Sequence, residues 1–234
     1  MPQDAAFDAP LPRHRAWLSL GVVAVSIAVD VTLFRFYWRG LLDDTTVSTL
    51  RVANGAGAMA IVSVLLRRSR VDMGLRFESD IPWRLVLKWG IRGAGAFVAL
   101  FAVWVGAFAQ LRGACALRVI PSFGVEYILS GALVAPLVEE PLYRGALCPA
   151  AHSVLGRRGG IVVSGAVFGG LHVIYGNAGI ANLTAGFLFG WLFYWSRSLL
   201  VPSLVHGAGN GLLFGLQYLT RWFYEVDATT CGVS

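Results

Sequence analysis

The sequence predicts an all-α fold, a polytopic bundle of transmembrane helices, and three observations lead to this class. Of the 234 residues, 56% are hydrophobic and only 14% are charged, and the mean hydropathy is +0.66. A soluble domain carries more charge and fewer apolar residues. The apolar residues also gather in long stretches, most of them close to the roughly 20 residues of helix that a bilayer core requires.

Seven apolar stretches are long enough to be predicted as membrane spans. They are residues 16–38, 48–66, 86–111, 123–151, 159–176, 179–196 and 199–219. The fourth stretch is long and residues 71–92 are ambiguous, so a count of eight spans is the alternative. Residues 69–84 are predicted to form a cytoplasmic loop or a helix in the membrane interface.

The predicted organisation has four parts. Residues 1–15 form a polar N-terminal segment in the cytoplasm, and residues 16–119 hold the N-terminal transmembrane helices and the cytoplasmic loop. Residues 120–219 form the transmembrane core that carries the polar motifs, and residues 220–234 form a C-terminal tail. The N-terminal segment lacks the short apolar core and small-residue cleavage site of a signal peptide, so the first span is expected to be retained.

Arginines near the ends of the predicted spans indicate their orientation. The loops on one side carry the larger set: Arg13, Arg15, Arg67, Arg68, Arg70, Arg76, Arg84, Arg157, Arg158 and Arg197. The alternate loops carry the smaller set: Arg39, Arg51, Arg112, Arg118 and Arg221. The positive-inside rule therefore predicts a cytoplasmic N-terminus and, with seven spans, a C-terminus outside.

This topology accounts for the net charge of +6, so no nucleic acid partner is expected. Lys88 is the only lysine among 19 basic residues, and the chain has 28 glycines. Such a bias suggests a GC-rich bacterial genome. The expected location is therefore integral to the bacterial inner (cytoplasmic) membrane.

Charged residues interrupt the fourth stretch, where each costs about 2.5–3.5 kcal/mol on insertion scales. Glu140 and Arg144 are four residues apart and share a helix face, which predicts a structural ion pair. Glu139 points about 100° away from Glu140 and is the freer carboxylate. Pro141 has no N–H to donate to the Leu137 carbonyl one turn earlier, and this favours a kink in the helix. The alternative is that the three charged groups form a buried network that only holds the bundle together.

A histidine of the fifth stretch is predicted to lie near Glu139. The residues from Gly156 to Gly159 form a turn that joins the fourth and fifth stretches as a helical hairpin. In an antiparallel pair, Glu139 and His172 then differ in depth by about 6 Å. Phe168 lies on the same helix face as His172 and is expected to wall the site.

The seventh stretch contributes His206 and Asn210, which are four residues apart and share a helix face. The predicted span limits place His206 at a shallower depth than His172. Helix tilt or a loop that dips into the membrane before Pro202 would bring the two histidines level.

Three motifs occur in one order along the chain: Glu-Glu-x-x-x-Arg at 139–144, Phe-x-x-x-His at 168–172 and His-x-x-x-Asn at 206–210. Together they resemble the CPBP family, which includes the CAAX prenyl proteases and bacteriocin-processing proteins. The resemblance covers roughly residues 120–215. It implies a glutamic-type intramembrane endopeptidase whose catalytic core is the third part of the chain.

The resemblance also implies a role for each site residue. Glu139 and His172 would activate a water molecule, and His206 and Asn210 would stabilise the oxyanion. The residues that would support the site are Glu140, Arg144 and Phe168. The expected reaction is hydrolysis of a peptide bond near the C-terminus of a membrane-anchored protein or peptide, with the lipid bilayer as the second partner.

Alternatives to this function remain. Glu139, His172 and His206 are residue types that bind Zn²⁺, but the helical HExxH spacing is absent, so a mechanism without a cofactor is favoured over a zinc metalloprotease. A non-catalytic immunity or scaffold protein would keep the same polar network for packing. A transporter would use buried Glu and His as a proton relay, although no internal repeat is evident.

Overall fold

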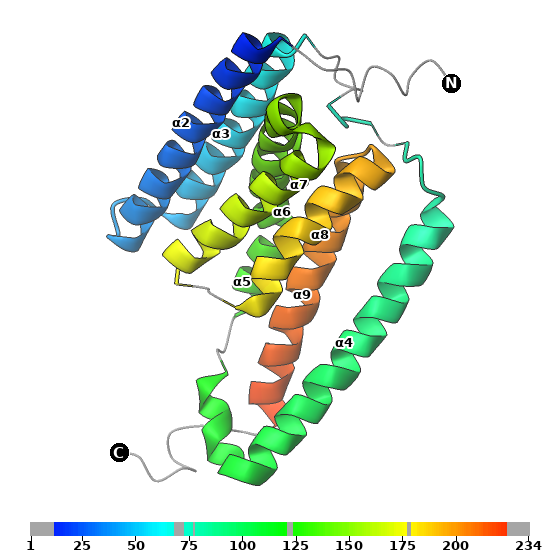
Figure 1. Ribbon diagram of the computed structural model, residues 1–234. Coiled ribbons are helices and arrows are strands. Elements are labelled where there is room, and N and C mark those ends of the chain that lie inside the picture. The colour runs from blue at the N-terminus through cyan, green and yellow to red at the C-terminus, as the bar shows by residue number, and fades with distance from the viewer. Residues whose placement is uncertain (1–11, 68–72, 77, 121–123, 177–178, 224–234) are drawn as a thin grey trace. The chain divides into compact units, whose positions relative to one another are not determined.

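The computed structural model describes residues 12–67, 73–76, 78–120, 124–176 and 179–223, and every regular element in that part of the chain is helical (Figure 1). The α-helices are α2 (Arg13–Trp38), α3 (Asp44–Leu65), α4 (Trp83–Arg112), α5 (Val125–Leu129), α6 (Ala135–Glu140), α7 (Cys148–Ile174), α8 (Ile180–Ser196) and α9 (Leu200–Phe223). One 3₁₀-helix and two π-helices complete the list: η1 (Ala114–Val119), η2 (Ser130–Val134) and η3 (Pro141–Leu147).

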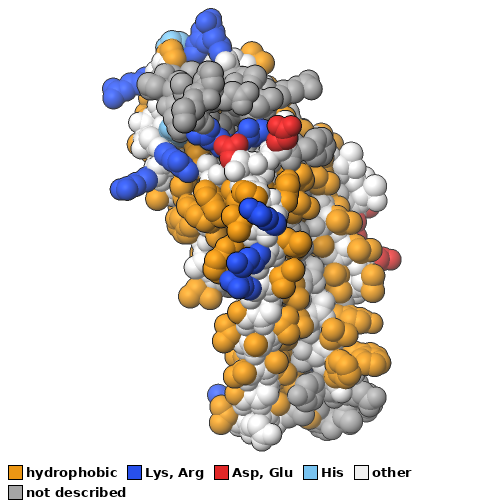
Figure 2. All heavy atoms as spheres, turned by 90° about the vertical axis from the view of Figure 1, so that its right-hand side faces the viewer, with side chains coloured by type: hydrophobic (Ala, Val, Ile, Leu, Met, Phe, Trp, Pro, Cys, Tyr) orange, Lys and Arg blue, Asp and Glu red, His pale blue; other side chains and the backbone are white. Residues whose placement is uncertain are grey.

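Helices occupy all seven of the predicted apolar stretches, so the all-α class is confirmed. Three helices, α2, α3 and α4, are long and apolar enough to cross a membrane. Their outward side chains fit a lipid environment, since large apolar residues such as Val25, Val64 and Leu100 are mostly exposed. Figure 2 shows one face of the molecule, where hydrophobic side chains predominate and acidic ones are few.

The described residues form two compact units. The first combines residues 1–81 with 134–206, and the second combines residues 82–133 with 207–234. Helix α9 therefore contributes its first turns to the first unit and the rest to the second. In the second unit, Val105 of α4 forms a small hydrophobic cluster with Leu117 and Ile120.

Helices α2 and α3 pack through one face each in the first unit. The buried residues of α2 recur every three or four positions: Ala16, Ser19, Val23, Ser26 and Asp30. Asp43 caps α3 by accepting a hydrogen bond from the Thr46 amide at 2.8 Å, and this bond lowers the pKa of the Asp43 carboxyl. Gly55 lets α3 approach α6 closely, because a Cβ there would lie 2.7 Å from the Val138 carbonyl oxygen.

The fourth stretch is one helical path in which π-helical turns precede and follow α6. The second of these, η3, begins at Pro141, the residue predicted to disturb the helix. In α7, Gly156 adopts a φ of 72° and interrupts the helix. The chain reverses there, since the Cys148 thiol lies 3.5 Å from the Gly160 carbonyl oxygen. The predicted hairpin between the fourth and fifth stretches is thus present.

The segment before α4 contains no helix in its described residues, 73–76 and 78–82, so the predicted interfacial helix is not formed there. Instead its backbone pairs with the junction between α8 and α9. The Leu199 amide donates to the Gly74 carbonyl at 2.8 Å, and the Asp80 amide donates to the Ser196 carbonyl at 3.0 Å. These bonds replace the ones that a helix would make within itself.

Candidate active site

Two adjacent carboxylates end α6 inside the first unit. Glu140 is fully buried, and its Oε1 accepts hydrogen bonds from Arg144 Nη1 at 3.2 Å and His206 Nδ1 at 2.9 Å. Arg144 is fully buried as well and donates from Nη2 to the Gly186 carbonyl of α8 at 2.9 Å. This is the ion pair that the four-residue spacing predicts, and it joins η3 to α8 and α9.

Glu139 has fewer fixed contacts than Glu140. Its Oε1 lies 4.0 Å from Arg51 Nη2, and its Oε2 lies 3.9 Å from His206 Nε2. Oε2 is buried and accepts no hydrogen bond from any described residue. Glu139 is thus the freer carboxylate, as the helix geometry predicts.

His206 stands between the two carboxylates. Its Nδ1 donates to Glu140, which fixes the orientation of the ring and turns Nε2 towards Glu139. Phe189 stacks on the ring with a centroid distance of 4.9 Å and an interplanar angle of 20°. The depth mismatch expected from the sequence therefore does not keep His206 away from the acidic pair.

Phe168 is the shared wall of the site, as predicted. Its ring centroid lies 4.4 Å from that of His172 and 5.8 Å from that of His206, and the Arg144 guanidinium lies 4.7 Å from it. With only 1% of its surface exposed, Phe168 excludes water from this side of the ion pair. Charged hydrogen bonds are stronger in such a dry environment.

His172 is half-buried, and its Nδ1 lies 2.9 Å from the Phe168 carbonyl oxygen, one turn earlier in α7. The register of the hairpin follows from Ser164, whose hydroxyl donates to the Tyr143 carbonyl at 3.0 Å. Extending that antiparallel register brings Glu139 level with Phe168, one turn from His172. The offset of about one turn agrees with the spacing argument. His172 meets the acidic pair through Phe168.

Asn210 is the one predicted site residue in the second unit. There its side-chain amide donates to the Gly131 carbonyl of the π-helix η2 at 2.9 Å. Its predicted position beside the reacting carbonyl stays a prediction.

A second ion pair, which the sequence alone did not predict, adjoins Glu139. Arg51 was expected in an outer loop, but it lies in α3, where its Nε and Nη2 donate to Asp30 at 2.7 and 3.0 Å. Asp30 is buried, with 1% of its surface exposed. The signal was the inward stripe of small residues on α2, which ends at Asp30.

The polar side chains do not assemble a metal centre in the part of the chain that the structure describes. No three of its His, Cys, Asp and Glu residues come together in an arrangement that could hold a metal ion.

One family model matches this region of the chain, residues 121–212, and its description is "Type II CAAX prenyl endopeptidase Rce1-like". Residues 121–212 of the chain are thus similar to this family. The matched region contains all three motifs and every predicted site residue. No curated protein and no solved structure matches the chain.

The match to the Rce1-like family model identifies the protein as a protease, and the apolar helices α2, α3 and α4 are consistent with a membrane setting. The matched region begins after α4, so the helices that supply Asp30 and Arg51 lie outside it.

Proposed function

We propose that the protein is an intramembrane endopeptidase that hydrolyses a peptide bond near the C-terminus of a membrane-anchored protein or peptide. The proposed setting is the bacterial inner membrane, crossed seven times with the N-terminus in the cytoplasm. The family match supports the reaction class. The single observation that carries the mechanism is the Glu139 carboxylate, which is buried and keeps Oε2 without a hydrogen bond from any described residue.

Glu139 is the proposed general base. A water molecule placed between Glu139 Oε2 and His206 Nε2, which are 3.9 Å apart, could lie within hydrogen-bond distance of both atoms. The water oxygen attacks the scissile carbonyl carbon while its proton passes to Glu139, which then delivers it to the leaving amine nitrogen. His172, behind Phe168, is proposed to assist the activation of the water.

The negative charge on the carbonyl oxygen requires hydrogen-bond donors in the tetrahedral intermediate. His206 and Asn210 are proposed to supply them. A protonated His206 would donate from Nδ1 to Glu140 and keep Nε2–H for the oxyanion. Glu140 and Arg144 hold the His206 ring in place through the contacts at 2.9 and 3.2 Å. The proposed mechanism uses no cofactor, and zinc bound by Glu139, His172 and His206 is the alternative.

The test is cleavage of a quenched fluorogenic peptide with a membrane anchor, either farnesyl or a hydrophobic segment, by the full chain in nanodiscs. Glu139→Gln should lower turnover by at least about 10²-fold, because it removes a general base and little volume. Glu126→Gln is the matched control, since Glu126 is exposed on α5, and it should cleave normally. Equal turnover by Glu139→Gln and wild type would reject Glu139 as the base. If neither wild type nor Glu139→Gln cleaves the peptide, a non-catalytic scaffold protein would be favoured.

A further inference from the structure

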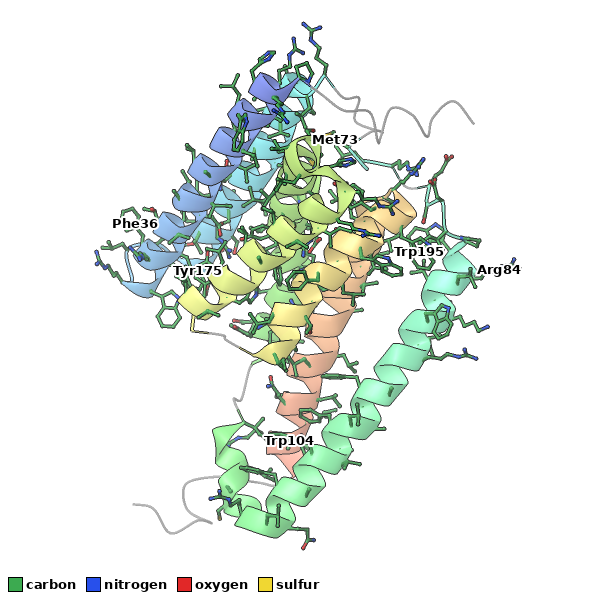
Figure 3. All side chains as sticks on the ribbon, viewed as in Figure 1. Phe36, Met73, Arg84, Trp104, Tyr175 and Trp195 are labelled. Atoms are coloured by element: carbon green, nitrogen blue, oxygen red, sulfur yellow. The ribbon has the colours of Figure 1, made fainter. Side chains whose placement is uncertain are left out.

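A partly buried cluster on α2, α3 and the end of α7 reaches Glu139 Oε1, whereas His206 lies near Oε2. The cluster consists of Asp30, Arg51 and Tyr175. The guanidinium of Arg51 binds both carboxylate oxygens of Asp30, at 2.7 and 3.0 Å, so its planar fork is fixed in direction. The Tyr175 hydroxyl donates to Asp30 Oδ2 at 3.1 Å. Figure 3 shows Tyr175 at the end of α7, next to α2.

Aromatic and amide contacts hold the cluster rigid. The Phe34 ring lies 4.4 Å from the Tyr175 ring, between centroids, and 5.5 Å from the Arg51 guanidinium carbon. One turn after Arg51, Asn54 donates to the Ser26 carbonyl of α2 at 2.8 Å. Asp30 therefore has both oxygens engaged, and Arg51 has little freedom to move away from α6.

The remaining partner of Arg51 is Glu139. Arg51 Nη2 and Glu139 Oε1 are 4.0 Å apart, which is too long for a hydrogen bond but close for a charge interaction. Glu139 is thus held by charge through Oε1, while Oε2 faces His206. A hydrogen bond from Arg51 would engage the carboxylate directly, whereas a charge at this distance orients the carboxylate and leaves its oxygens free to accept hydrogen bonds from water.

We propose that Asp30, Arg51 and Tyr175 form a positioning cluster that orients the Glu139 carboxylate for water activation. This rests on the proposed function. Arg51 acts through Glu139 and touches no reacting atom. Asp30 fixes the orientation of the Arg51 guanidinium, and Tyr175 fixes the orientation of the Asp30 carboxylate. Because Tyr175 follows His172 by three residues on α7, the cluster also fixes the helix end that carries His172.

The first test is the kinetics of full-length Arg51→Gln in nanodiscs with the anchored fluorogenic peptide. Turnover, kcat, should fall by about 10²-fold with little change in KM, because misplacing a catalytic group costs the chemical step and not substrate binding. Arg51→Lys should recover part of the loss, since it keeps the charge and loses the fork. Asp30→Asn should lower kcat too, and the double variant Asp30→Asn, Arg51→Gln should be no worse than Arg51→Gln alone.

Arg76→Gln is the matched control for losing a partly buried arginine ion pair. The Arg76 side chain is 16% exposed and pairs with Asp80, whereas that of Arg51 is 15% exposed. Arg76→Gln should lower the melting temperature about as much as Arg51→Gln and leave kcat unchanged. The positioning role is overturned if Arg51→Gln is folded and keeps wild-type kcat. It is equally overturned if kcat falls in both variants in step with melting temperature.

An infrared measurement tests the contact without any cleavage. The Glu139 carboxylate band is identified as the difference between wild type and Glu139→Gln, with glutamate labelled by ¹³C. Arg51→Gln should shift this band, and Arg76→Gln should not. An unshifted band would reject the positioning contact. A shifted band in a protein that shows no cleavage dependent on Glu139 would reject the proposed function and leave the contact standing.

Discussion

Glu140 and Arg144 have no exposed surface, a condition that costs several kcal/mol per ion unless each charge is paired. The two charges pair with each other. In addition, Glu140 accepts a hydrogen bond from His206, and Arg144 donates one to the Gly186 carbonyl. Arg144 Nε and Glu140 Oε2 still have no hydrogen-bond partner among the described residues. Buried polar atoms without a partner require an explanation, and a role in catalysis is one that would supply it.

Removing either member of that pair should destabilise the protein. Glu140→Ala and Arg144→Ala each leave one buried charge uncompensated, which costs about 3–5 kcal/mol. Both variants should show a lower melting temperature and yield in detergent. Arg92→Ala, which removes an exposed arginine of α4, should melt like wild type. Unchanged melting in both site variants would mean that the pair is not formed.

Asn210→Ala tests the oxyanion role. Loss of one donor to an oxyanion typically lowers kcat by about 10²–10³-fold with a weak effect on KM. His172→Ala should be at least as damaging, since it would impair activation of the water. If Asn210→Ala instead keeps full kcat and binds substrate poorly, Asn210 belongs to a recognition surface. If Asn210→Ala lowers the melting temperature but keeps normal kinetics, the role of Asn210 is structural, through its hydrogen bond to the Gly131 carbonyl.

At the scale of single elements, most helices could be predicted from the length of the apolar stretches and the spacing of the polar residues. The helices follow the apolar stretches because a chain in lipid must satisfy its backbone hydrogen bonds internally. The Glu140–Arg144 pair followed from one helix face, and the break at Gly156 from a glycine and arginine turn. The ion pair between Arg51 and Asp30 was not predicted, because it depends on which faces of α2 and α3 meet. Helix periodicity alone does not reveal those faces.

The close contact between α3 and α6 gives a paired test. Gly55→Ala places a Cβ 2.7 Å from the Val138 carbonyl oxygen, so backbone must shift, at about 1–3 kcal/mol for overpacking. Gly57→Ala meets no atom within 4 Å and should melt at or above the wild-type temperature. Because Glu139 follows Val138, Gly55→Ala should lower turnover as well. Equal melting temperatures for the two variants would show that α3 and α6 lie further apart than in this structure.

At the scale of the whole molecule, composition predicted the membrane class, and the order of three motifs predicted the family. Neither gives the span count: among the residues that the structure describes, α2, α3 and α4 are the helices that meet the length and hydropathy of a membrane span. The short α8 and the interrupted α7 are shaped by packing against each other, with Gly186 lying against Gly165. Such helices are less recognisable from apolar length alone.

The purified protein also allows a test of the metal-free mechanism. EDTA or phenanthroline should leave peptide cleavage in detergent unchanged, and elemental analysis should find well under one zinc per chain, because Glu139 acts directly as the base in this mechanism. Inhibition by chelators with recovery on adding Zn²⁺ would instead make Glu139, His172 and His206 ligands. Cobalt substitution would then give a visible spectrum that depends on each of them.

The π-helical turns around α6 make residue number itself a determinant of the site. A π turn holds one residue more than an α turn, so it amounts to a one-residue insertion within a helix. The extra residue is accommodated within η3, so the helix on either side keeps its direction. If η3 became α-helical at unchanged length, the residues beyond it would rotate by about 100° relative to Glu139. A deletion of one residue within η3 would instead accompany a return to α-helix with the flanking directions kept. Chains that share these motifs but are one residue shorter between Glu139 and Cys148 would therefore hold the same chemical groups in similar directions.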